Sequence, residues 1–194
     1  MQDLTMHIMD LMQNSIHAGC SRLTLTVGLT SGDEYLEIKL EDDGNGMSQE
    51  VQEKALDPFY TSRDTRDVGL GISLFKGAVE TAEGRLFLFS EEGKGTGIRG
   101  LMKNNSIDRQ PLGNVGNLLF LHMLSHPDIP VRLHIYRGPV SFTFDSHKWM
   151  ESREEAGGTA MDAAFMAETM VEEEIKKIFQ GGLPEMGGSS DAVK

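Results

Sequence analysis

Hydrophobic residues along this chain follow two spacings, one of three or four residues and one of two residues. The first spacing opens the chain, where Leu4, Ile8 and Leu11 fall on one side of a helical projection. Gly19 follows this pattern directly, and glycine commonly ends helices because it adopts left-handed backbone angles at little cost. The pattern therefore predicts an amphipathic helix over residues 2–18.

Strict alternation of apolar and polar residues follows in two neighbouring segments, residues 23–27 and 36–40. Turn-forming residues at 31–33 separate them, so we expect an antiparallel hairpin with one buried face. The same spacings, with glycine and proline breaks, predict the remaining elements. These are a helix at 49–56 capped by Ser48, a helix at 70–82, strands at 85–90 and 97–103, a helix at 113–125, a hairpin over 131–146 and a helix at 160–179.

This order of elements predicts a mixed α/β fold, an α+β two-layer sandwich with helices on one face of a mostly antiparallel sheet. We expect the core in residues 1–104. Residues 105–150 would add a helix and a hairpin, residues 151–181 an acidic helix, and residues 182–194 a disordered tail. The hairpin either completes the domain or offers an edge strand to a partner.

In the last predicted helix, large apolar side chains are expected to line one buried face. They are Met161, Phe165, Ile175, Ile178 and Phe179. The acidic residues of this helix leave two alternatives open, a solvated outer face or a docking face for a partner. Trp149, which precedes the helix, is expected to pack the hairpin onto the core.

Composition narrows the class of protein. With 194 residues, 39% of them hydrophobic, the chain can bury a normal core. Its net charge of −12 and its lack of a basic stripe argue against nucleic acid and against an anionic membrane surface as partners. The single cysteine, Cys20, excludes an internal disulfide, and we find no signal peptide or membrane-spanning stretch. We therefore expect a cytoplasmic protein in which Cys20 is a small buried thiol.

Asp10 and Asn14 form the first candidate functional pair. Their spacing of four places both on one face of the first helix. An amide oxygen is a suitable ligand for Mg²⁺, and a carboxylate one turn away can orient or deprotonate a water. Taken alone, the pair fits an ordinary solvated helix face equally well.

The sequence DDGNGM at 42–47 follows a predicted strand directly. Asp42 can accept a hydrogen bond from an exocyclic amine such as that of adenine, while Gly44 and Gly46 let the backbone turn and a flat ring approach. An ordinary turn into a helix is the alternative.

Two further glycine-rich segments suggest phosphate chemistry. DVGLGIS at 67–73 opens a predicted helix, whose N-terminal amides suit phosphate, and Arg63 and Arg66 precede it in a polar loop that would act as a lid. GKGTG at 93–97 joins two strands and also fits a tight hairpin. Neither segment is a Walker A loop, and no G-x-G-x-x-G follows any strand.

The order and spacing of these four motifs resemble the Bergerat-fold ATPases, the GHKL family of gyrase B subunits, heat-shock chaperone ATPases, sensor histidine kinases and MutL proteins. The resemblance covers Leu4 to Lys103. QNSIHAG from residue 13 is similar to the MutL type, and DPFYTSRDTRDVGLGIS from residue 57 is similar to the histidine-kinase type. The resemblance implies a Bergerat-type ATP-binding fold with ATP or ADP as ligand and Mg²⁺ as cofactor.

The resemblance also implies a role for each matching residue. Asn14 would ligate Mg²⁺, Asp42 would accept the adenine amine, and Asp10 would be the catalytic carboxylate. The other contacts to the nucleotide would come from Gly44, Gly46, Met47, Phe59, Arg63, Arg66, Gly69, Leu70, Gly71 and Thr96. Hydrolytic members of the family usually carry Glu where Asp10 stands, and the shorter side chain favours slow hydrolysis or binding alone.

The histidines give weaker indications of function than these motifs. His7, one turn before Asp10, is expected to be structural and not a phospho-acceptor. His122 and His126 have the spacing of metal ligands, but no cysteine or second pair completes a set, so we expect no metal there. Because the first motif begins at residue 10, we expect no phospho-accepting hairpin before it.

Two hypotheses follow. In the first, the protein is a Mg-ATP-binding signalling protein that phosphorylates a separate protein partner or hydrolyses ATP slowly. In the second, it is a non-catalytic ATP/ADP sensor whose lid closure controls partner binding. A DNA-repair or topology ATPase fits poorly because the chain is acidic, and whether the protein is a homodimer stays open.

Overall fold

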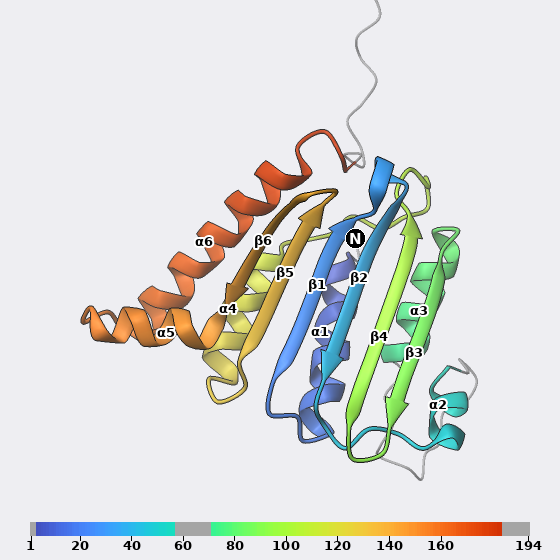
Figure 1. The fold of residues 1–194 in the computed structure, drawn as a ribbon, viewed down its shortest axis with the longest axis horizontal. Helices are drawn as coiled ribbons and strands as arrows, with labels where there is room; N and C mark the ends of the chain where they lie inside the picture. The colour runs from blue at the N-terminus through green and yellow to red at the C-terminus, as the bar shows by residue number, and fades with distance from the viewer. Residues whose placement is uncertain (1–2, 57–70, 184–194) are drawn as a thin grey trace, which may run out of the picture.

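The computed structural model describes residues 3–56 and 71–183. A single mixed sheet of six strands, in the order β3-β4-β2-β1-β5-β6, forms one layer (Figure 1). Helices α1, α3, α4 and α6 pack against one of its faces, as the mixed α/β prediction requires. The strands are β1 (Leu23–Leu29), β2 (Tyr35–Asp42), β3 (Arg85–Glu91), β4 (Gly95–Lys103), β5 (Val131–Arg137) and β6 (Val140–Asp145). The helices are α1 (Leu4–His17), η1 (Ser31–Asp33), α2 (Gln49–Ala55), α3 (Gly71–Thr81), α4 (Val115–Ser125), α5 (Ser146–Glu155) and α6 (Ala160–Phe179).

The first helix and the first hairpin form as predicted. Asp3 caps α1 by accepting a hydrogen bond from the Met6 amide at 3.2 Å, and Gly19 follows the helix with φ +72°. β1 and β2 pair antiparallel, with Leu25 opposite Leu40 on the helix-covered face. The alternation of the sequence thus fixes which face of this hairpin is buried.

The second hairpin continues the same sheet. β5 pairs with β1 in parallel, with Leu133 beside Leu25, and β6 pairs with β5 antiparallel. The Trp149 indole donates a 2.8 Å hydrogen bond to the Ala163 carbonyl, and its ring lies 5.8 Å from that of Phe144. Trp149 therefore packs the hairpin against α6, as expected. The hairpin thus extends the sheet and makes β6 its outermost strand, and pairing of this edge with a partner stays a prediction.

The C-terminal part departs from the prediction in two places. Helix α5 was not predicted, because its residues form no apolar stripe. On α6, Ile175, Ile178 and Phe179 are buried as predicted, but Met161 and Phe165 are 56% and 62% exposed. The rest of the buried face consists of Ala163, Ala164, Ala167 and Val171. The physical reason is close packing. A Cβ on Gly116 of α4 would lie 2.5 Å from the Glu168 carbonyl oxygen, so the two helices approach closely at this point.

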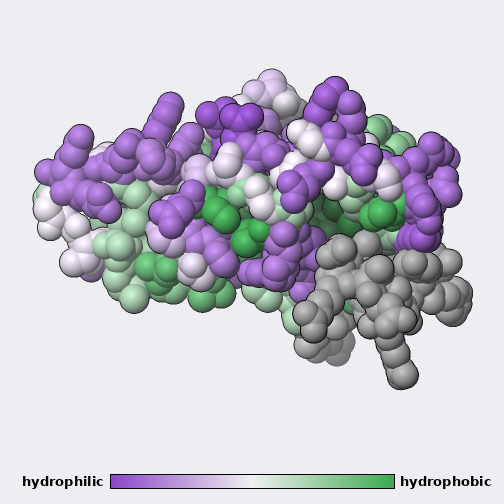
Figure 2. Space-filling model, turned by 90° about the horizontal axis from the view of Figure 1, so that it is seen from below, coloured by the Kyte–Doolittle hydropathy of each residue, from purple (hydrophilic) through white to green (hydrophobic). Residues whose placement is uncertain are grey.

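The two faces of the molecule differ in character. The open face of the sheet is mainly hydrophilic, whereas hydrophobic residues reach the surface on the helix side (Figure 2). None of the described helices combines the length and the apolar composition that crossing a lipid bilayer takes. The division of the chain near residue 104 remains a prediction.

Candidate functional site

Most of the predicted site residues that the structure describes meet in one place, between α1, the end of β2 and the start of β4. There the protein encloses a cavity of about 90 Å³. Its walls are largely apolar, with polar groups at one edge. The lining residues are Leu11, Asn14, Ser15, Ala18, Asp42, Gly46, Met47, Ile72, Thr96 and Ile98. Apolar walls with a few fixed polar groups suit a heteroaromatic ring.

Asp42 is the most firmly held polar group of this cavity. The Ser15 hydroxyl donates to its Oδ2 at 2.6 Å, and the amides of Gly44 and Thr96 donate to its Oδ1 at 2.9 and 3.1 Å. These donors belong to α1, the loop after β2, and β4. The carboxylate is therefore fixed in orientation, and the lone pairs that remain on Oδ2 can accept one more hydrogen bond.

Its neighbour Asp43 has a different task. It accepts hydrogen bonds from the Ser21 amide and hydroxyl at 2.8 and 2.7 Å, and from the Arg22 amide at 3.1 Å. The Ser21 hydroxyl foremost, with the two amides, lowers the pKa of Asp43 below its ordinary value of 3.8. Asp43 thus anchors the loop after α1 and is absent from the cavity lining.

The two glycines of the loop after β2 allow neighbouring backbone segments to approach closely, and this explains their presence better than contact with a ligand does. A Cβ on Gly46, whose φ is +66°, would lie 2.0 Å from the Glu91 carbonyl oxygen, and one on Gly44 would lie 2.9 Å from the Ala18 carbonyl oxygen. Gly46 lines the cavity, whereas Gly44 contributes through its amide. Glycine is required at both positions so that the loop can pack against α1 and the β3–β4 turn.

Residues behind Thr96 were missed by the sequence analysis. The Thr96 hydroxyl lies 2.9 Å from that of Ser90, which also accepts the Met47 amide at 2.8 Å. Gln52 Nε2 bridges the carbonyls of Met47 and Ser90 at 3.0 and 2.9 Å. One signal was available: Ser90 is a polar residue at an inward-facing position of β3, after Leu86 and Leu88.

The start of α3 lies directly against α1. A Cβ on Gly71 would be 3.0 Å from Asn14 Nδ2 and 3.2 Å from Asp10 Cβ. Asn14 Nδ2 is buried and has no hydrogen-bond partner among the described residues. An unsatisfied buried N–H donor is costly, so this one is suited to a hydrogen-bond acceptor beyond the described residues. The other residues predicted near the phosphates, which are Phe59, Arg63, Arg66, Gly69 and Leu70, lie outside the described residues.

Two buried histidines have structural partners. His7 is buried, packs against the Phe75 ring and lies 3.2 Å from Gln110 Oε1. His122 donates through Nε2 to the Ile129 carbonyl at 2.7 Å, and burial lowers its pKa below the ordinary 6.5. Among residues 3–56 and 71–183, no three His, Cys, Asp or Glu side chains gather in a way that could hold a metal.

Cys20 is buried just behind the cavity. Burial foremost, and then the charges of Asp42 and Asp43, raise the pKa of its thiol to about 11. The thiol therefore stays neutral at physiological pH, as expected of a structural cysteine.

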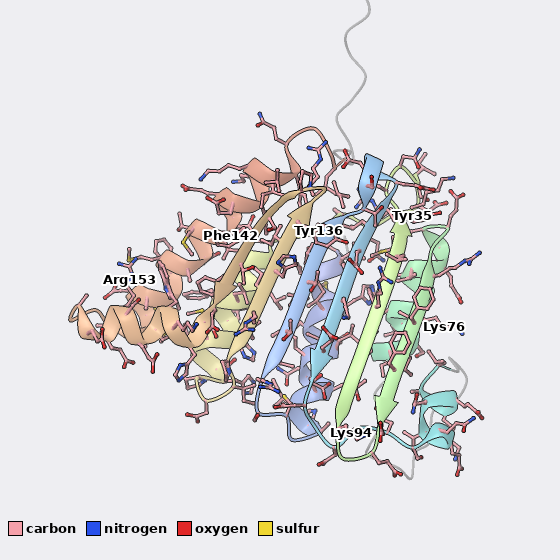
Figure 3. The ribbon with its side chains drawn as sticks, viewed as in Figure 1. Tyr35, Lys76, Lys94, Tyr136, Phe142 and Arg153 are labelled. Atoms are coloured by element: carbon pink, nitrogen blue, oxygen red, sulfur yellow. The ribbon has the colours of Figure 1, made fainter. Side chains whose placement is uncertain are left out.

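A larger hollow of about 830 Å³ lies on the open face of the sheet, but it is shallow and its charges are already paired. Lys39 pairs with Glu41 at 2.7 Å, and Arg99 and the Tyr136 hydroxyl both donate to Glu37. Figure 3 labels Tyr136 on this face. We therefore place the functional site in the smaller cavity beside Asp42.

The N-terminal half of the chain is similar to known proteins. Residues 2–104, just over half of the chain, match the family described as histidine kinase-, DNA gyrase B-, and HSP90-like ATPase. The sensor kinase CckA of Brucella abortus is 36% identical over 64 residues, which are 32% of this chain and 7% of that protein. A probable C4-dicarboxylate sensor kinase of Halalkalibacterium halodurans is 31% identical over 98 residues, 48% of this chain and 18% of that protein.

Among solved structures, the N-terminal domain of a DNA repair protein is similar with a TM-score of 0.48 and 15% identity, over 75% of this chain and 52% of that one. The region matched spans less than a fifth of the length of the two kinases.

Proposed function

The chain belongs to the family of histidine kinase-, DNA gyrase B- and HSP90-like ATPases and is thus a nucleotide-binding protein, and we propose that the cavity beside Asp42 is its ATP site. One observation carries the proposal: Asp42 is a carboxylate fixed by three hydrogen bonds at the edge of an otherwise apolar cavity. Its Oδ2 accepts the adenine amine, Leu11 and Ile98 pack beside the ring, and Thr96 supports the base.

The phosphates bind at the start of α3. Helix N-termini favour anions because their first amides have no partner within the helix. Gly71, with Gly69 and Leu70, would bring backbone amides to the phosphates, and Phe59, Arg63 and Arg66 would form the lid. The absence of a side chain at Gly71 supports this assignment, since α3 can then begin directly beside Asn14.

Asn14 is the residue that would hold Mg²⁺. Its side chain lies beside Gly71, and its amide oxygen is a suitable hard ligand for this ion. Its Nδ2, which has no partner among the described residues, is a donor and would face a phosphate oxygen instead of the metal. When bound, Mg²⁺ neutralises phosphate charge. The side chain of Asp10, one turn earlier on α1, is exposed and faces the same region. It would orient a water or the hydroxyl or imidazole of an incoming acceptor.

We propose a role in signalling, with phosphoryl transfer to a separate protein or slow hydrolysis as the reaction. The sensor kinases that match residues of the nucleotide-binding region support transfer over hydrolysis. Asp10, where hydrolytic relatives usually carry Glu, supports slow turnover and keeps a second function open. In that alternative, ATP and ADP are sensed through lid closure without chemistry.

Calorimetric titration of ATP and ADP, with and without Mg²⁺, tests the site. In Asp42→Asn, the amide would retain an acceptor for Gly44 and Thr96 but would present a donor to Ser15 and to adenine. We expect at least about a hundredfold weaker ATP binding, the equivalent of about 2.7 kcal/mol. Asp43→Asn is the matched control and should bind ATP like the wild type. Equal binding by both variants would refute the site.

The second experiment separates kinase from sensor. Asp10→Ala should bind ATP within about threefold of the wild type, because Asp10 makes no contact to the base in this assignment. If the protein is an enzyme, release of labelled phosphate or its transfer to a protein partner should fall at least about tenfold. A wild-type protein that binds ATP but neither transfers nor releases phosphate with any partner would favour the sensor.

A further inference from the structure

The part of the chain beyond the family match carries an exposed hydrophobic surface. Leu121 on α4, and Met161 and Phe165 on α6, are 48%, 56% and 62% exposed, and Leu124 on α4 is half-buried. We refer to these four side chains as the α4–α6 apolar patch. Large apolar side chains that gather on a surface mark interaction sites more often than isolated ones do.

The contacts between α4 and α6 show how these side chains are arranged. Asn117 Nδ2 donates to Glu168 Oε1 at 3.2 Å, and the Gly116 amide donates to Glu172 Oε1 at 2.8 Å. The earlier residue of α4 thus meets the later residue of α6, so the two helices run antiparallel. Moving toward the C-terminal end of α4 means moving toward the N-terminal end of α6.

This direction brings the patch together. Its members on α4 lie four and seven residues after Asn117, and its members on α6 lie three and seven residues before Glu168. Steps of three, four and seven residues return to the same side of a helix. Leu121 and Phe165 therefore stand one turn beyond the Asn117–Glu168 contact, and Leu124 and Met161 stand two turns beyond it. The patch is a continuous strip along the seam of the two helices.

Acidic residues lie near this strip. Asp162 and Glu168 flank the patch along α6. Asp128, Glu151 and Glu154 line, together with His126 and His147, a hollow at the C-terminal end of α4. Helix α4 itself carries neither lysine nor arginine. In Figure 2, the hydrophobic surface on the helix side lies among hydrophilic residues. A partner must therefore offer apolar side chains in a line and positive charge beside them.

We propose that the α4–α6 apolar patch binds an amphipathic helix with a basic polar face, supplied by a separate protein. A helix fits this surface. Its apolar residues at three- and four-residue spacing form a line along one side, and such a line can lie along the seam between two helices. A second copy of this chain would bring the same acidic rim against its own, and an anionic membrane would be repelled likewise. The surface lies beyond the matched residues 2–104 and shares no residue with the cavity beside Asp42.

A synthetic peptide tests the proposal. The probe is a fluorescein-labelled helix of about 18 residues with Leu at i, i+3, i+4 and i+7 and Lys elsewhere, measured by fluorescence anisotropy against the full chain. Phe165→Ser combined with Leu121→Ser should weaken binding at least about tenfold. Met166→Ser is the matched control, because Met166 is 44% exposed on the same helix but points about 100° away from Phe165, and it should bind as the wild type does.

Two peptide controls define the chemistry. Replacing every Lys of the probe by Glu should abolish binding, and scrambling its sequence at constant composition should weaken binding at least about tenfold, because the apolar line is lost. Unchanged binding by the Phe165→Ser/Leu121→Ser variant, or equal binding by the scrambled peptide, overturns the proposal. So does a dimer of the free chain, seen by sedimentation velocity, that Phe165→Ser dissociates, since the occupant would then be a second copy.

Discussion

The Ser15 hydroxyl donates a 2.6 Å hydrogen bond to Oδ2 of Asp42, the same oxygen that faces the proposed base. Ser15 is 5% exposed and lies one position after Asn14, so α1 contributes to both ends of the candidate nucleotide site. Because the bond joins the first helix to the end of β2, the orientation of the carboxylate depends on how these two elements pack.

Ser15→Ala should therefore weaken ATP binding without unfolding the protein. Hydrogen bonds to charged groups contribute about 1.5 kcal/mol or more, which corresponds to about a tenfold loss in affinity by calorimetry. Ser21→Ala is the control, since it removes the 2.7 Å bond to the neighbouring Asp43 and should leave affinity unchanged. If both variants bind ATP like the wild type, Asp42 is held well enough by backbone amides alone.

Gly71→Ala should reduce ATP affinity at least about tenfold, because the new Cβ would lie 3.0 Å from Asn14 Nδ2 and push α3 away from α1. Gly77→Ala, on the same helix with nothing within 4 Å of its Cβ, should instead stabilise the fold by about 0.5–1 kcal/mol and leave affinity unchanged. Thermal unfolding and calorimetry on both variants separate the two effects. A loss of affinity in Gly77→Ala would show that general helix stability, not contact at Gly71, controls binding.

Local patterns of the sequence were sufficient for most elements. The spacing of apolar residues within a helix or strand shows which of its faces is buried. Leu25 and Leu40 of the first hairpin are examples, since both are buried. The motifs around Asp42 and Asn14 also carry information in their order, which indicated that they would meet. Ser15, Ser90 and Gln52 were missed because their roles depend on partners 27, 43 and 38 residues away.

The C-terminal part shows where local patterns fail. Hydrophobicity alone placed Met161 and Phe165 on the buried face of α6, whereas small residues such as Ala164 occupy that face and the two large side chains are exposed. Helix α5 has an N-cap residue, because Asp145 accepts a hydrogen bond from the Lys148 amide at 3.2 Å. Its sequence lacks the regular apolar spacing from which a helix is predicted. The distance between two packed helices depends on the tertiary structure, and it cannot be read from the spacing of apolar residues in a single sequence.

Tyr136→Phe should destabilise the open face of the sheet by about 1–2 kcal/mol in chemical unfolding, because Glu37 is 7% exposed and would lose one of its donors. Tyr35→Phe is the control, since the Tyr35 hydroxyl makes no hydrogen bond with another described residue; Figure 3 labels both tyrosines.

Burial foremost, and then the bond to Glu37, raise the pKa of Tyr136 above its ordinary 10.0. The folded state therefore holds this proton more tightly, and the stabilisation present below pH 10 should decline at higher pH.

Cys20 should react slowly with a thiol reagent such as dithionitrobenzoate. With its pKa raised from 9.0 to about 11, the thiolate fraction at pH 8 is about a hundredfold lower than that of an unperturbed thiol. Urea-unfolded protein is the control and should react at the rate of free cysteine. The sign for stability follows from the same shift: the folded state binds the proton more tightly, so the contribution is complete below pH 9.0 and is lost as the pH rises toward about 11. A folded protein that reacts at pH 8 as fast as the unfolded chain would mean that the thiol is neither buried nor influenced by Asp42 and Asp43, and it would place the loop after α1 differently from the structure.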